Sequence, residues 1–141
     1  MIGILLISHA HIASETVAAV EHILGKQTGL KAMDMPNSDV LCHEQEHFNQ
    51  LLASVDGGQG VLVMVDLFGA TPCNVVLDSV QPISIEVVAG FNVPAVIKAV
   101  SLRNDTCNLR ELAQASVKSG QQYLQLTNDK NLAQEMGIAH D

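Results

Sequence analysis

The chain has 141 residues, of which 48% are hydrophobic and 16% are charged, so it is long enough and apolar enough to bury a substantial core and is not a disordered protein. Seven Lys and Arg residues against fifteen Asp and Glu residues give a formal charge of −8. That charge argues against nucleic acid or anionic lipid as the main partner and favours a partner protein with a basic face.

Two further features predict a cytoplasmic location. The apolar run Met1–Ile7 has no basic residue before it and is too short for a signal peptide or a membrane span. The cysteines Cys42, Cys73 and Cys107 share no CxxC spacing, which is typical of reduced thiols inside the cell.

The order of apolar and amphipathic segments predicts a three-layer α/β/α domain with a mainly parallel central sheet. Short apolar runs alternate with stretches of helical length, which is the pattern of βαβ units, and no repeat or low-complexity tract divides residues 1–141. We expect strands at about residues 2–7, 30–35, 60–65 and 83–89, with a short final strand at 123–126. We expect helices at about residues 12–24, 39–55 and 71–80, from the loop at 90–94 to about 102, and at 108–118, with a polar tail from about residue 127.

Local signals set several of these helix ends. Gly25 ends the first predicted helix, and Ser38 or Asp39 caps the second. Thr71 before Pro72 is an N-cap residue followed by proline at the first helical position. Gly120 is expected to end the last helix.

In an open parallel sheet, reactive groups gather beyond the carboxyl ends of the strands, where the strand order reverses. Three segments meet this condition: residues 8–11, residues 66–72 and residues 90–94. If the first and third strands are neighbours, His9 and Asp66 face each other across one crevice.

A histidine beside an aspartate in such a crevice is suited to phosphoryl transfer. A neutral imidazole is a competent nucleophile near pH 7, and a carboxylate that accepts the proton of one ring nitrogen aims the other nitrogen outward. Backbone N–H groups at the starts of the first and third helices would cradle the phosphoryl oxygens, with the Thr71 hydroxyl as a further donor.

Three segments carry a resemblance to a known family: residues 2–9 (IGILLISH), residues 61–74 (VLVMVDLFGATPCN) and residues 90–94 (GFNVP). In sequence and spacing they resemble the signature regions of mannose-family IIA domains of the bacterial sugar phosphotransferase system. The similarity extends over about the first 125 residues, and the stretch from Asp66 to Pro72 is its most specific part.

The resemblance implies roles for these residues and for partner proteins. His9 corresponds to the phosphoacceptor, which receives its phosphoryl group from the carrier protein HPr and donates it to a IIB subunit. Asp66 corresponds to the aspartate that orients the histidine, and Thr71 to a hydroxyl residue beside the site. The resemblance further implies a homodimer whose terminal segments pack across the interface, and a reaction with no metal or cofactor. The sugar cannot be read from a IIA sequence, because such a subunit contacts only phosphate and partner proteins.

The chain departs from the family pattern next to the phosphoacceptor. The residue after the active histidine is usually glycine, whereas Ala10 stands here. His11 follows two residues after His9, and we expect it to be a partly exposed residue in the first turn of the first helix.

Other patterns fit less well. The stretch from His43 to His47 matches the HExxH zinc motif, but neither histidine lies at the centre of the apolar stripe of its predicted helix and no third ligand is in view. A receiver domain would need an acidic pair where Ser8 and His9 stand. A regulatory phosphoprotein that other proteins sense, with no sugar transported, stays open because its chemistry at His9 is the same.

Overall fold

Strands and helices alternate along the chain in the computed structural model, which describes residues 1–35, 41–67, 76 and 82–127, without the side chains of residues 41–43. The strands are β1 (Gly3–His9), β2 (Leu30–Met35), β3 (Val61–Val65) and β4 (Ile85–Ala89). The helices are α1 (Ile12–Leu24), α2 (Leu41–Val55), α4 (Val93–Leu102) and α5 (Leu109–Gln122). The predicted helix at 71–80 lies outside the described residues apart from Val76, as do the cap at Ser38 or Asp39 and the polar tail from residue 128.

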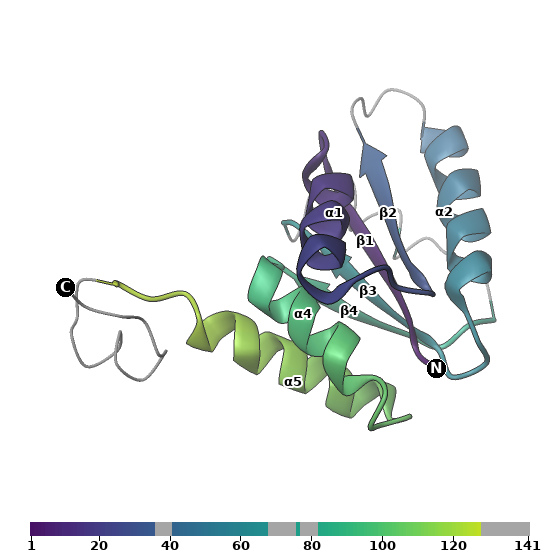
Figure 1. Cartoon of the computed structure of the whole chain (residues 1–141). Coiled ribbons are helices and arrows are strands. Elements are labelled where there is room, and N and C mark those ends of the chain that lie inside the picture. The colour runs from purple at the N-terminus through teal and green to yellow at the C-terminus, as the bar shows by residue number, and fades with distance from the viewer. Residues whose placement is uncertain (36–40, 68–75, 77–81, 128–141) are drawn as a thin grey trace.

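The described strands form one parallel sheet in the order β2-β1-β3-β4 (Figure 1). Ile7 of β1 pairs with Val65 of β3, and Ser8 of β1 pairs with Asp34 of β2. Chain order therefore reverses between β1 and β3, so a crevice is expected at their carboxyl ends. The predicted parallel α/β architecture is confirmed.

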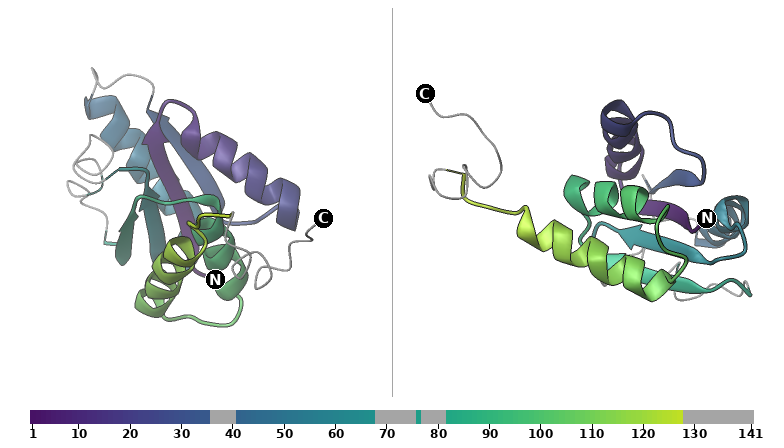
Figure 2. Two further views of the ribbon diagram at one scale, coloured as in Figure 1. Left: turned by 90° about the vertical axis from the view of Figure 1, so that its left-hand side faces the viewer. Right: turned by 60° about the horizontal axis from the view of Figure 1, so that its bottom comes forward.

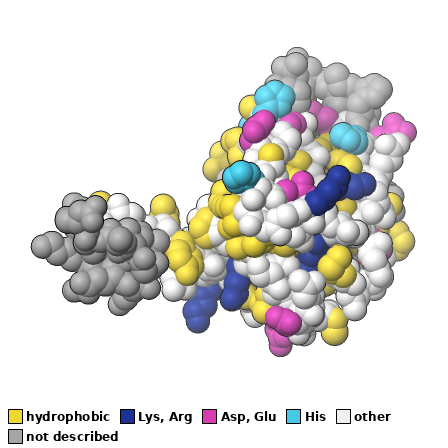
Figure 3. All heavy atoms as spheres, viewed as in Figure 1, with side chains coloured by type: hydrophobic (Ala, Val, Ile, Leu, Met, Phe, Trp, Pro, Cys, Tyr) yellow, Lys and Arg dark blue, Asp and Glu magenta, His cyan; other side chains and the backbone are white. Residues whose placement is uncertain are grey.

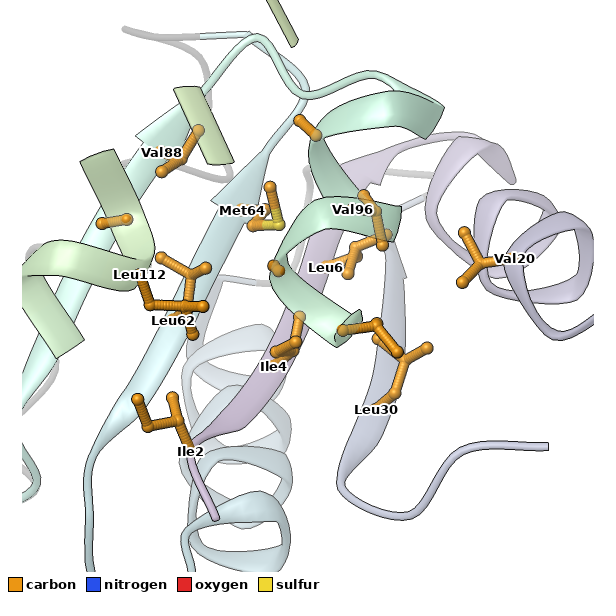
Figure 4. Close-up of a cluster of buried hydrophobic side chains, with 14 of the residues drawn as sticks. Ile2, Ile4, Leu6, Val20, Leu30, Leu62, Met64, Val88, Val96 and Leu112 are labelled. Atoms are coloured by element: carbon orange, nitrogen blue, oxygen red, sulfur yellow. The ribbon is translucent and has the colours of Figure 1, made fainter. Parts of the chain in front are cut away.

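Helices cover both faces of the sheet (Figures 1 and 2). Alternate residues of β1 point to opposite faces: Ile4 and Leu6 pack with α1, α4 and α5, as Figure 4 shows, while Leu5 and Ile7 pack with α2. Each of these side chains is fully buried, which contributes about 1.5–3 kcal/mol apiece as an upper estimate. The central strand β1 is thus held from both sides.

Arg103, just after α4, ties the amino-terminal end of the sheet together. Its Nη1 donates to the carbonyl oxygens of Ile2 and Gly29, both at 3.2 Å, and its Nη2 donates to that of Thr28 at 2.6 Å. The side chain is buried, and burial lowers the pKa of its guanidinium. The hydrogen bonds to main-chain carbonyls compensate part of the cost of burying this charge.

The predicted strand at 123–126 is wrong. Helix α5 continues through Gly120 to Gln122, and the residues after it lie along no strand of the described sheet. Gly120 does not end the helix because it serves close packing: a Cβ there would lie 2.9 Å from Oδ1 of Asn92 and 3.1 Å from Cβ of Ala95. A glycine that admits another helix and a glycine that ends a helix look alike in sequence.

The other boundaries agree with prediction to within a few residues. Strand β1 runs on to His9, because Ser8 and His9 pair with β2, β4 begins at Ile85, and α2 begins at Leu41. Within the described residues, no helix is both long and apolar enough to cross a lipid bilayer.

Candidate functional site

His9 and Asp66 meet at the carboxyl ends of β1 and β3. His9 is the last residue of β1, and Asp66 follows β3 directly. Oδ2 of Asp66 accepts the backbone N–H of His9 at 3.0 Å and lies 2.9 Å from Nδ1 of its ring. The N–H of Asp66 in turn donates to the carbonyl oxygen of Ile7 at 3.2 Å. The structure therefore brings together the two side chains that the sequence placed across one crevice, whereas Thr71 lies outside the described residues.

This contact selects one ring nitrogen of His9 for chemistry. An ionised carboxylate can only accept hydrogen bonds, so Nδ1 carries the proton and Nε2 keeps its lone pair in the neutral ring. The His9 side chain is 48% exposed while that of Asp66 is 13% exposed. A fixed tautomer on an accessible ring is the arrangement that a nucleophilic histidine needs.

A second carboxylate, that of Asp34 near the end of β2, lies at the same edge of the sheet on the other side of β1. Its Oδ1 accepts the N–H of Ser14 at 3.0 Å, and its Oδ2 accepts the Ser14 hydroxyl at 2.6 Å. Nδ1 of His11 lies 3.1 Å from the same Oδ2. His11 is exposed as predicted, with 75% of its side chain accessible, but it is the N-cap residue of α1 and is paired with Asp34.

The pKa of the Asp34 carboxyl is lowered even though the group is partly buried. Burial, the largest influence, would raise the pKa of this carboxyl, but the hydrogen bonds from Ser14 and His11 together outweigh it. A lowered carboxyl pKa stabilises the fold above the unfolded pKa, and this contribution is lost as the pH falls through the folded pKa. Asp34 therefore stays ionised at neutral pH.

The sequence reading missed Asp34, Ser14 and the role of Ser8. The available signal was an acidic residue near the carboxyl end of the strand predicted at 30–35, since Asp34 pairs in register with Ser8. The buried Ser8 hydroxyl accepts the N–H of Ala13 at 2.6 Å and so caps α1 from outside the helix.

These caps reduce the number of N–H groups that the start of α1, expected to cradle a phosphoryl group, can offer to it. The N–H of Ala13 is bonded to Ser8 and that of Ser14 to Asp34. Because these amides already have acceptors, the start of α1 offers an anion fewer free donors than a bare helix end does.

Ala10, between the two histidines, has a φ of +49°. It is the one non-glycine residue with positive φ in the part of the chain that the structure describes. An alanine in this left-handed region is strained because its Cβ crowds the backbone, and glycine relieves that strain. A glycine at this position would relieve the strain, and this chain sustains the turn without one.

The HExxH pattern gains no support among the described residues, where no group of three His, Cys, Asp or Glu side chains is placed to hold a metal ion. Glu46 and His47 are exposed on α2, and the side chain of His43 lies outside the described part.

Comparisons with known proteins show what the sequence and the fold of this chain are similar to. A family model described as the PTS system fructose IIA component, EIIA-man, matches residues 3–117. The mannose-specific EIIAB component of Escherichia coli (strain K12) is 30% identical over 128 residues, which cover 86% of this chain and 38% of that protein. The chain thus spans well under half the length of this relative.

Two solved structures are similar over nearly their whole length. The mannose/sorbose specific IIA subunit of the phosphotransferase system from Enterococcus faecalis is 28% identical with a TM-score of 0.71, covering 89% of this chain and 93% of that one. Component EIIA from Streptococcus agalactiae gives a TM-score of 0.81 at 21% identity, covering 91% and 98%, and supports the fold.

Replacing Ala10 by glycine should stabilise the protein. Relief of the left-handed strain is worth about 1–2 kcal/mol, and the added freedom of the unfolded chain returns part of it, so we expect the free energy of unfolding to rise by up to about 1 kcal/mol. Chemical denaturation measures this. Ala18→Gly, at an exposed position inside α1, is the matched control and should lower it by about 1 kcal/mol. A similar loss in Ala10→Gly would contradict the strain at this turn.

Proposed function

The chain belongs to the EIIA-man family, the IIA components of the mannose type of phosphotransferase system, and we propose that it carries a phosphoryl group on Nε2 of His9. The donor in this proposal is phospho-HPr and the acceptor is a IIB subunit. The observation that supports it is the contact of Nδ1 of His9 with Asp66, which leaves the Nε2 lone pair available in the neutral form of a half-exposed ring.

Nδ1 of His9 keeps its proton throughout the transfer. The Nε2 lone pair attacks phosphorus while the bond from phosphorus to the donor nitrogen breaks, and the donor ring leaves with that electron pair. The His9 ring gains positive character as its new bond forms, and the Asp66 carboxylate stabilises it through Nδ1–H. Donation to the IIB subunit is the same displacement in reverse. We assign the Thr71 hydroxyl to the phosphoryl oxygens as a further donor.

Charge favours this choice of partners. A chain with a formal charge of −8 attracts a donor with a basic face and increases the rate of encounter at low salt. We place the protein in the cytoplasm, where HPr acts.

We also propose that the protein is a homodimer. Beyond α5, Leu124 and Leu126 are 83% and 73% exposed, and hydrophobic side chains gather where this segment leaves the body of the molecule (Figures 1 and 3). Exposed leucines on a projecting segment are suited to packing against a second copy.

Sedimentation equilibrium at micromolar concentration should give close to twice the chain mass of 15.0 kDa. Leu124→Ser together with Leu126→Ser should shift the protein toward the monomer, because both changes remove exposed apolar surface and leave the core untouched. A monomeric wild type at every accessible concentration would sink the dimer.

The phosphoacceptor is tested by labelling. Incubation with phosphoenolpyruvate, enzyme I and HPr should add one acid-labile phosphoryl group per chain, and His9→Ala should abolish it because no nucleophile remains at the site. His47→Ala, which removes an exposed histidine on α2, should still be labelled. Label that persists in His9→Ala protein would exclude His9 as the acceptor.

The role of Asp66 is tested by Asp66→Asn, which removes the charge at nearly constant volume. An amide can flip and donate, so tautomer control is weakened and transfer from phospho-HPr should slow by roughly 10²–10⁴-fold. Rapid-quench kinetics measures the rate, and Asp105→Asn, at an exposed carboxylate after α4, should react at the wild-type rate. A wild-type rate in Asp66→Asn would show that the pair forms no functional unit.

A further inference from the structure

The phosphoryl group on His9 must be held at an edge that carries no Lys or Arg. The sequence has no Lys or Arg in residues 1–25 or 32–97, and these stretches supply β1, β3 and every segment that follows a strand end at this edge. Asp34 and Asp66 already place negative charge there. On the face shown in Figure 3, the dark blue Lys and Arg side chains lie at mid-height and below, where one group adjoins an acidic side chain.

A bound phosphoryl group adds about two negative charges, which needs donors or positive charge nearby. Two main-chain donors at the start of α1 are already taken, because Ser8 and Asp34 accept the N–H groups of Ala13 and Ser14. Apart from His9 itself, the one side chain on the described loops of this edge that can become a cation is that of His11.

The position of the His11 side chain is supported by Asp34. Asp34, fixed by both the N–H and the hydroxyl of Ser14, contacts Nδ1 of His11 and leaves Nε2 outside this contact, as Asp66 does in His9. A mere cap residue would need no such support, and the His11 side chain makes no capping hydrogen bond to α1. Residues two apart have Cα atoms at most about 7 Å from each other, so a group on His9 lies within reach of His11.

Acidic side chains lie on the segments next to His11. Asp34 on β2 contacts the ring, Glu15 lies in the first turn of α1, and Asp66 lies across β1. Lys98, the one charged side chain of α4, lines the groove against α5 instead. A dianionic group on His9 would add to this negative surrounding.

We propose that His11, held by Asp34, binds the phosphoryl group on His9 through an imidazolium Nε2–H and so stabilises the phosphorylated protein. This inference rests on the proposed function of His9. It makes the phosphorylated state depend on pH: the stabilisation is present while His11 is protonated and is lost as the pH rises and the ring becomes neutral.

The test compares the equilibrium constant for phosphoryl transfer from phospho-HPr in His11→Gln and wild-type protein. Glutamine can still donate an N–H to Asp34 but carries no charge. At about pH 6 the constant should be roughly tenfold lower in His11→Gln, the effect of one charge pair near a protein surface, and the difference should shrink by about pH 8.5. Because the same donor is used, its own pH dependence cancels in the ratio.

Two variants separate charge from structure. His22→Gln removes an exposed histidine in the last turn of the same helix and should behave as wild type at every pH. His11→Lys keeps a positive charge over the whole range and should restore the equilibrium constant without its pH dependence.

The outcomes are distinguishable. A His11→Gln constant equal to that of wild type, or lower by the same factor at every pH, overturns the inference and leaves the role of His9 intact. Label that survives in His9→Ala and disappears in the double variant with His11→Gln also overturns it, because His11 would then be an acceptor itself. Wild-type protein that takes no label at His9 refutes the proposed function instead.

Discussion

The site depends on one carboxylate oxygen. Oδ2 of Asp66 contacts both the backbone N–H and the ring of His9, so it fixes the end of β1 and the direction of the imidazole together. This is possible because Ile7 pairs with Val65 in the parallel register, which brings the residue after β3 beside the last residue of β1. A slip of one residue would turn every β1 side chain to the other face and separate the pair. The apolar packing on both faces of β1 is therefore what keeps the reactive ring oriented.

The two carboxylates at this edge lie on opposite sides of β1. Asp66 comes from the β3 side and Asp34 from the β2 side, and each contacts an imidazole through Nδ1. The turn that carries both histidines is closed by Ala10 in a left-handed conformation, at an energetic cost that the surrounding hydrogen bonds offset. The same network takes up N–H groups at the start of α1 that would otherwise bind an anion.

Prediction from sequence succeeded where a physical pattern repeats along the chain. Continuous apolar runs and amphipathic stretches located the strands and most helices, and the rule for carboxyl ends in parallel sheets brought His9 and Asp66 together. It failed where one residue type serves two purposes. The sequence predicts a helix stop at Gly120, because its close contact with Ala95 of α4 is a tertiary feature that no sequence pattern shows. The role of Asp34 is not evident from sequence, because an acid in a half-buried strand shows its hydrogen-bond partners only in three dimensions. The positive φ of Ala10 likewise has no sequence signature.

The hydrogen bonds of Arg103 limit how early the newly synthesised chain can complete its sheet. Its guanidinium bonds to the carbonyl oxygens of Ile2, Thr28 and Gly29, which are synthesised long before it. While the ribosome extends the chain, the carbonyls of Ile2 and Thr28 lack their Arg103 donor, and that of Gly29 can have only the N–H of Ile4, until the residue after α4 has emerged. Contacts of such large sequence separation form late because the intervening chain must first be ordered. The amino-terminal end of the sheet is therefore completed only after most of the protein has been made, although its residues come first.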